Sequence, residues 1–170
     1  NKQINVSFID SPGLNTDLFK TATLFNQQQD IDVVVFVVNA SFHLTLSGRQ
    51  FLQRAAQEKE KIFFVVNKFD EIENSRKCKS IITKQIREIL PETFDDASNL
   101  IHFISAKQFF LKATDIENPP STQIDINVDE VNLKNTYDKY TDSFSNMKAS
   151  LLDFVYVKRS VSKLAPAKTY

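Results

Sequence analysis

The stretch KIFFVVNKFDEI, residues 61–72, is an apolar run that breaks abruptly into polar side chains. Its apolar part, 62–66, has the length and composition of a short buried strand. Asn67, Lys68 and Asp70 follow where such a strand would end. In parallel α/β sheets, ligands bind beyond the carboxyl ends of the strands. The stretch therefore predicts a buried strand that delivers three polar side chains to a ligand.

Other apolar runs alternate with helical patterns along the chain. We expect further strands at residues 5–9, 31–38 and 100–104. The run at 31–38 is apolar on both faces, which is typical of a central parallel strand. The helical patterns cover about 15–28, 47–60, a segment that includes 82–90 and, at the end of the chain, 142–165. This alternation predicts an α/β fold in three layers, with helices on both faces of a mostly parallel sheet.

Three details refine the expected helices. Ser47-Gly48-Arg49-Gln50 fits a capping box and predicts the start of the second helix. Pro91 ends the third helix, which carries Ile82, Ile86, Ile89 and Leu90 at helical spacing. The last helix carries an apolar stripe that indicates core rather than a partner-binding face: Phe144, Met147, Leu151, Phe154, Val161 and Leu164.

Composition limits the possible classes of protein. The 170 residues make one domain, with 42% hydrophobic and 25% charged residues. Basic and acidic residues number 21 each, so no net field recruits nucleic acid or an anionic membrane. The single cysteine, Cys78, excludes an internal disulfide and suits a reducing compartment. No apolar run reaches the roughly 18 residues that a membrane span needs.

The segment 112–141 departs from the alternating pattern. It is polar and acidic, and it contains Pro119-Pro120. Such composition predicts a poorly ordered surface insertion, with a docked functional loop as the alternative. The closing helix is expected at 142–165, and residues 166–170 begin a following helical region.

Three polar motifs follow three different expected strands. They are Asp10-Ser11-Pro12-Gly13, Asn67-Lys68-Phe69-Asp70 and Ser105-Ala106-Lys107. Each alone is a weak signal, but all three at the carboxyl ends of parallel strands predict a single site.

The chemistry of two of these motifs suits guanine. Asp70 has two acceptor oxygens side by side, which match the N1–H and exocyclic amine of guanine and find no such pair on adenine. Asn67 can donate to the N7 edge of the purine or brace neighbouring loops. The methylene stem of Lys68 can lie along the base. Ser105 and Ala106 are small, so their backbone N–H groups can approach the guanine carbonyl oxygen.

The first motif suits phosphate and metal. Asp10 is placed to hold Mg²⁺ through water, because this ion gives up its hydration shell reluctantly. Gly13 lets a backbone N–H come close to the terminal phosphate.

The motifs DSPG, NKFD and SAK resemble the third, fourth and fifth sequence motifs of GTP-binding proteins. The runs VSFIDSPGLN, DVVVFVVNAS and FFVVNKFD resemble the mitofusin/fuzzy-onions branch of the dynamin superfamily. The resemblance covers residues 4–111 well and 141–170 moderately. It implies a P-loop GTPase-type domain, of which 1–111 is a part. It also implies nucleotide contacts by Gly13, Asn67, Lys68, Asp70, Ser105, Ala106 and Lys107.

A phosphate-binding loop of the form G-x-x-x-x-G-K-[ST] does not occur in these residues, since Gly13 and Gly48 are the only glycines. In the family resembled, this loop precedes DSPG, and the sequence starts at Asn1 without methionine. We therefore expect an N-terminally truncated GTPase domain whose isolated fragment is inactive, with no catalytic residue assigned in it. A degenerate, non-hydrolysing domain is the alternative.

For the intact protein, the resemblance implies Mg²⁺-dependent GTP hydrolysis that drives tethering and fusion of mitochondrial outer membranes. The domain would face the cytosol, with the membrane segments outside this chain and no role for nucleic acid. The family also implies a homodimer through the GTPase domain, with Phe69 as an exposed contact; alternatively, Phe69 folds under the helix around Ile82. A regulatory GTPase switch and a nucleotide-free interaction module are the other function classes. His43 and His102 lack metal-ligand spacing, and His102 is expected to be a packed core residue.

Overall fold

The computed structural model describes residues 6–11, 13, 31, 33–58, 61–117 and 142–158 of the chain. Within them, a parallel sheet has the strand order β1 (Val35–Asn39), β2 (Phe63–Asn67), β3 (Ile101–Phe103). The helices are α2 (Leu46–Glu58), α3 (Ser75–Ile89), α4 (Pro91–Asp95), α5 (Ala97–Leu100), α6 (Ala106–Glu117), the 3₁₀ turn η1 (Phe69–Glu71) and a closing helix, 142–158. The expected α/β class is confirmed.

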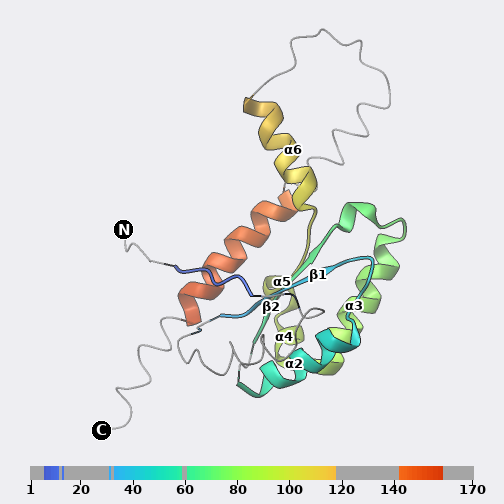
Figure 1. Cartoon of the computed structure of the whole chain (residues 1–170), viewed down its shortest axis with the longest axis vertical. Helices are drawn as coiled ribbons and strands as arrows, with labels where there is room; N and C mark the ends of the chain where they lie inside the picture. The colour runs from blue at the N-terminus through green and yellow to red at the C-terminus, as the bar shows by residue number, and fades with distance from the viewer. Residues whose placement is uncertain are drawn as a thin grey trace.

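Helices cover both faces of this sheet (Figure 1). Phe64 and Val66 of β2 belong to the hydrophobic cluster that α2 and α3 complete. The alternate residues Phe63 and Val65 belong to a second cluster, which the closing helix completes with Met147 and other apolar residues. Because side chains of a strand alternate between its two faces, both faces of β2 are buried. The predicted strand at 62–66 is confirmed, shifted by one residue.

The prediction that 31–38 is a central strand is wrong in one respect. Its strand, β1, lies at the edge of the described sheet, and Val37 is 61% exposed. Phe36 points to the opposite face and packs on Phe51 and Phe64. A run of β-branched and aromatic residues therefore indicates a strand, but not the number of its neighbours.

The predicted strand at 5–9 is also contradicted where the chain is described. Residues 6–9 have no regular secondary structure, and the Phe8 side chain is 81% exposed. A strand exists only by pairing, and no pairing of these residues occurs within the described sheet. Residue 5 and the helix predicted at about 15–28 lie outside the described residues.

The start of α2 differs from the predicted capping box. The hydroxyl of Thr45 accepts a hydrogen bond from the Gly48 N–H at 3.2 Å, so Thr45 rather than Ser47 is the cap. Gly48 has no side chain to return the bond, which leaves half of a box. The α3 helix ends before Pro91 as predicted, and Pro91 then opens α4 at its first turn.

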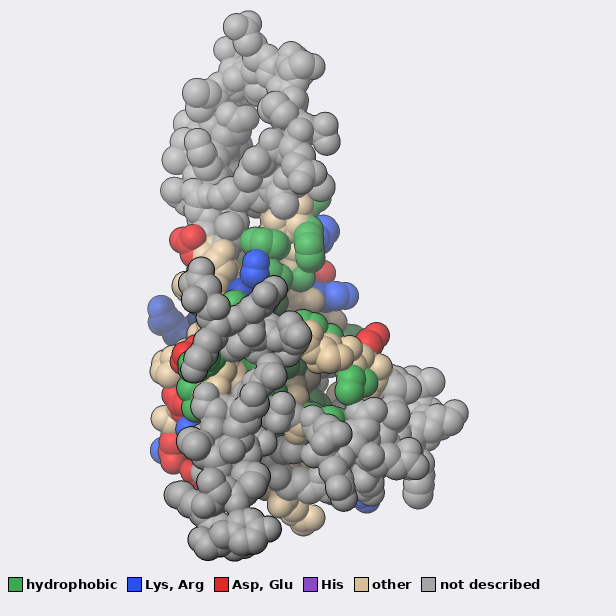
Figure 2. Space-filling view, turned by 90° about the vertical axis from the view of Figure 1, so that its left-hand side faces the viewer, with side chains coloured by type: hydrophobic (Ala, Val, Ile, Leu, Met, Phe, Trp, Pro, Cys, Tyr) green, Lys and Arg blue, Asp and Glu red, His purple; other side chains and the backbone are tan. Residues whose placement is uncertain are grey.

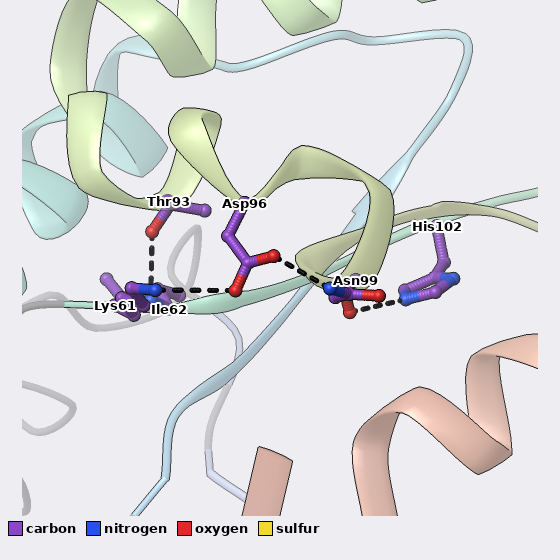
Figure 3. Close-up of polar contacts among 6 residues, drawn as sticks. All are labelled: Lys61, Ile62, Thr93, Asp96, Asn99 and His102. Atoms are coloured by element: carbon purple, nitrogen blue, oxygen red, sulfur yellow. Dashed lines mark hydrogen bonds and ion pairs between the residues drawn. The ribbon is translucent and has the colours of Figure 1, made fainter. Parts of the chain in front are cut away.

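Polar contacts join α4 and α5 to residues before β2 and within β3 (Figure 3). The Thr93 hydroxyl accepts from the Ile62 N–H at 3.0 Å, and Asp96 lies 3.3 Å from the Lys61 ammonium. The His102 ring bonds to the Asn99 carbonyl oxygen at 2.9 Å. It also stacks on the Phe63 ring, and burial lowers its pKa. The expectation that His102 is a packed core residue is confirmed.

The closing helix is confirmed over 142–158; its expected continuation lies outside the described residues. Figure 2 shows hydrophobic side chains at the surface where α6 meets this helix. The rings of Phe109 and Phe144 stack there at 4.1 Å, and Phe110 and Leu111 are exposed. The α6 helix continues to Glu117, past the predicted limit of the partial domain at residue 111. In the part of the chain described, no helix is long and apolar enough to cross a membrane.

Candidate functional site

The parallel strands bring their carboxyl ends to one edge of the sheet. Asn39 ends β1 and Asn67 ends β2, and the two are register partners. The β3 strand ends at Phe103, and Ser105 then precedes α6. The backbone N–H of Phe69 donates to the Ile104 carbonyl oxygen at 3.0 Å, so the turn after β2 lies against the end of β3. The NKFD and SAK motifs are therefore neighbours in space, as predicted.

Asn67 ties these two motifs together. Its Oδ1 accepts from the Lys68 N–H at 2.8 Å and from the Ala106 N–H at 3.1 Å. The second bond joins residues 39 positions apart in sequence. With Oδ1 engaged twice, the Asn67 amide nitrogen is left as the group that can donate to a ligand. Of the two roles predicted for Asn67, the bracing of neighbouring loops is confirmed.

Lys68 holds an uncommon backbone conformation in this turn. Its φ of 60° and ψ of 34° lie in the left-handed region, which a residue with a β-carbon rarely adopts. The bond from its N–H to Asn67 stabilises the turn in this form. Its side chain is exposed. The contacts of the surrounding turn compensate the conformational strain at Lys68, and such strained residues are common at binding sites.

Phe69 lies inside the protein and not at its surface. Its side chain is 3% exposed and contacts the Phe103 ring at 5.1 Å between centroids. The Lys79 ammonium lies 5.3 Å from the centre of the Phe69 ring. The prediction of an exposed aromatic contact is therefore wrong, and the alternative, in which Phe69 packs into the core beside α3, holds. Phe69 follows the left-handed residue Lys68, and the bond from its backbone N–H to the Ile104 carbonyl oxygen holds the turn against the sheet.

Asp70 is half-buried in η1 and meets a residue that the sequence reasoning missed. The amide nitrogen of Gln108 donates to Asp70 Oδ2 at 3.4 Å. The hydroxyl of Ser105, which is fully buried, caps α6 by accepting from the Gln108 N–H at 3.2 Å. The Ser-x-x-Gln spacing of a capping box could have drawn attention to Gln108. Lys107, beside it, is exposed in the first turn of α6.

The DSPG segment is described only in part. Asp10 and Gly13 are exposed and have no regular secondary structure. Within the described residues, no hydrogen bond or ion pair joins them to the NKFD and SAK motifs. Over the same residues, no group of three or more His, Cys, Asp or Glu side chains could hold a metal ion. An exposed carboxylate can accept a hydrogen bond from a water molecule of the Mg²⁺ hydration shell, so the chemistry of Asp10 fits this ion.

The turn after β1 is built differently from the turn after β2. The Asn39 side chain accepts from the Ser41 N–H at 2.9 Å, within its own turn. His43 has a φ of 51°, again in the left-handed region. Two residues of α3 hold this turn: Gln85 Oε1 accepts from the Leu44 N–H at 3.2 Å, and the Cys78 thiol lies 3.6 Å from the Ala40 carbonyl oxygen.

Cys78 is a structural thiol. It is buried, and this burial raises its pKa, so the thiol is held in its unreactive protonated form.

Comparison with known proteins gives a consistent result. The family model described as the Elongation factor Tu GTP binding domain matches residues 1–157. Mitofusin FZO1 of Saccharomyces cerevisiae is 49% identical over 105 residues, which are 62% of this chain and 12% of that protein. The Transmembrane GTPase Marf of Drosophila melanogaster is 26% identical over 115 residues, which are 61% of this chain and 14% of that protein. The chain thus spans a small part of the length of these relatives.

Proposed function

We propose a function for the intact protein from one premise: the chain belongs to the Elongation factor Tu GTP binding domain family, and among GTP-binding proteins to the mitofusin branch of dynamin-like GTPases. The intact protein binds GTP and hydrolyses it to GDP and phosphate. In this chain, the ends of β2 and β3 recognise the guanine base.

The bond between Asn67 and the Ala106 N–H is the observation that carries this proposal. It holds the turn that contains Asp70 against the first turn of α6. A guanine that lies between them can donate its N1–H and amine to Asp70, while its carbonyl oxygen accepts from backbone N–H groups near Ala106. The Asn67 amide nitrogen donates to N7, and the Lys68 stem covers one face of the base.

The phosphates and Mg²⁺ belong to the DSPG side of the site. Asp10 binds the ion through water, and the backbone N–H of Gly13 contacts the terminal phosphate. Asp10 would hold Mg²⁺ there, and the ion would supply positive charge beside the phosphates. The residues of this chain therefore bind and orient the nucleotide.

The direct test is nucleotide hydrolysis by the purified full-length protein, with phosphate release measured from GTP and from ATP in the presence of Mg²⁺. We expect turnover of GTP with a discrimination against ATP of about 10⁴-fold in kcat/KM, because Asp70 finds no donor pair on adenine. Equal turnover of both nucleotides would contradict guanine recognition. GTP binding without turnover would favour a non-hydrolysing domain, and no binding would favour an interaction module.

The names of the relatives support a cellular role as well. We infer that the intact protein resides in the mitochondrial outer membrane with this domain in the cytosol, and that GTP-dependent pairing of two such domains drives membrane tethering and fusion. Light scattering of the full-length protein with a transition-state mimic of GTP tests the pairing. Mixing of two fluorescent lipid labels between vesicles that carry the protein tests fusion. Fusion that proceeds equally with GDP would contradict a role for hydrolysis.

A further inference from the structure

Gln108 departs from the local bonding that its sequence position predicts. Ser105-Ala106-Lys107-Gln108 has the pattern of a capping box, in which the glutamine side chain accepts from the backbone N–H of the serine. Ser105 completes its own half of the box: its hydroxyl accepts from the backbone N–H of Gln108 at 3.2 Å. The Gln108 side chain does not complete the other half. Its Oε1 is buried and has no hydrogen-bond partner in the described part of the protein.

The side-chain amide nitrogen of Gln108 explains why the second bond of the box is not made. It donates to Asp70 Oδ2 at 3.4 Å, across 38 positions of sequence. Rotating the amide by half a turn would set Oε1 against the carboxylate oxygen, and two acceptors repel each other. The bond to Asp70 therefore fixes the orientation of the amide. A buried oxygen without a donor is uncommon in folded proteins and requires an explanation; here the contact with Asp70 supplies it.

We propose that Gln108 is a positioning residue that fixes the plane of the Asp70 carboxylate for guanine recognition. This inference rests on the function proposed above. Both carboxylate oxygens can accept from the N1–H and the exocyclic amine at once only when the carboxylate lies in the plane of the base. The Gln108 amide engages one lone pair of Oδ2 and leaves the other lone pairs of the carboxylate free for the base. It acts through Asp70, without contact of its own to the nucleotide.

The predicted signature is a loss of selectivity for the exocyclic amine. Hypoxanthine keeps the N1–H and the carbonyl oxygen of guanine but lacks this amine, so one carboxylate oxygen is enough to bind it. The ratio of GDP affinity to IDP affinity therefore reports whether both oxygens are in place. A residue that only stabilises α6 would weaken both nucleotides by the same factor.

The experiment titrates GDP and IDP, by calorimetry, into the purified full-length protein, three Gln108 variants and one control variant. Gln108→Leu and Gln108→Met remove the donor and the unpartnered oxygen with little change of volume. We expect the GDP-to-IDP ratio to fall about tenfold in both, which corresponds to the loss of one well-placed hydrogen bond to a charged group. Gln108→Glu should lower the ratio further, because a second carboxylate repels Asp70.

Gln85→Leu is the matched control. Gln85 is also a half-buried helical glutamine with a side-chain bond to a distant residue, the Leu44 N–H, but it lies outside the base site. Its variant should keep the ratio. An unchanged ratio in the Gln108 variants, with GDP still bound by the wild type, would overturn the positioning role alone. A wild type that binds no GDP would overturn the proposed function, and this inference with it. If Gln108→Leu does not fold, Gln108→Met and Gln108→Glu decide the question.

Discussion

The turns after β1 and β2 start from the same residue type at the same level of the sheet, yet only one of them forms the candidate site. Asn39 and Asn67 are register partners. Each turn contains a residue with positive φ, His43 in one and Lys68 in the other. The asparagines differ in their partners: Asn39 bonds within its own turn, whereas Asn67 reaches the first turn of α6.

The phenylalanines of the two turns show the same contrast. Phe42 is 71% exposed, and Phe69 is 3% exposed beneath its turn. The turn after β1 is held by α3 through Cys78 and Gln85, whereas the turn after β2 is held by β3 and α6. Residue type alone therefore does not define a site. The site is defined by the long-range partner that fixes the turn. Matched substitutions in the two turns can separate the effect of residue type from the effect of this partner.

The largest expected difference concerns the phenylalanines. Phe69→Ala should lower the free energy of unfolding of this domain by about 3–5 kcal/mol, because it leaves a cavity against Phe103. Phe42→Ala should change it by less than about 0.5 kcal/mol, because the ring is at the surface. Hydrogen exchange of the β2 amides in the full-length protein measures both values. Equal effects of the two substitutions would show that the turns are not built as described.

The asparagines should differ by a smaller amount. Asn67→Ala leaves the half-buried Ala106 N–H without an acceptor and should cost about 1–3 kcal/mol. Asn39→Ala removes one exposed bond within a turn and should cost at most about 1 kcal/mol. GDP affinity should fall only in Asn67→Ala. Thermal unfolding and nucleotide titration of the same samples check both statements, and a loss of GDP binding in Asn39→Ala would contradict the assignment of the site to the turn after β2.

The smallest effect is expected at the two left-handed residues. Lys68→Gly and His43→Gly both relieve a strained conformation and should each stabilise the fold by about 0.5–1 kcal/mol, after the added flexibility of glycine in the unfolded chain. Only Lys68→Gly should weaken GDP binding, because it removes the stem that covers the base. Denaturant unfolding and calorimetry compare the variants. A gain of stability at His43 with a loss at Lys68 would mean that the Lys68 side chain makes a stabilising contact of its own.

Much of this arrangement could be predicted from the sequence. The buried run before Asn67 and the small residues after the run at 100–104 correctly indicated two strands whose ends carry polar motifs. Parallel pairing then brings those ends together, because all carboxyl ends meet at one edge. This inference needs only the local pattern and the parallel direction of the strands, and the bond between Asn67 and Ala106 bears it out.

Other features depended on long-range packing, which a local pattern does not contain. The residues around Val37 have the composition of a central strand. The exposure of Val37 depends on which strand lies beside β1, and this is not contained in the local sequence. Phe69 is buried next to the left-handed backbone of Lys68, and lysine rarely adopts this conformation, so the local pattern does not predict the turn. Gln108 lies five residues after the end of β3. Its spacing from Ser105 predicts a local capping bond, whereas its side chain bonds to Asp70, 38 positions away.

The most direct test of the central claim, that the turn after β2 reads guanine through Asp70, is the affinity of Asp70→Asn in the full-length protein for GDP and for XDP. Xanthine carries a carbonyl oxygen where guanine carries its amine, and an amide can donate to that oxygen. GDP affinity should fall at least about tenfold and XDP affinity should rise above it, since the bonds at stake contribute about 1.5–3 kcal/mol each. Asp96→Asn, at the opposite end of the sheet, is the control and should change neither affinity. Unchanged GDP affinity in Asp70→Asn would contradict the account.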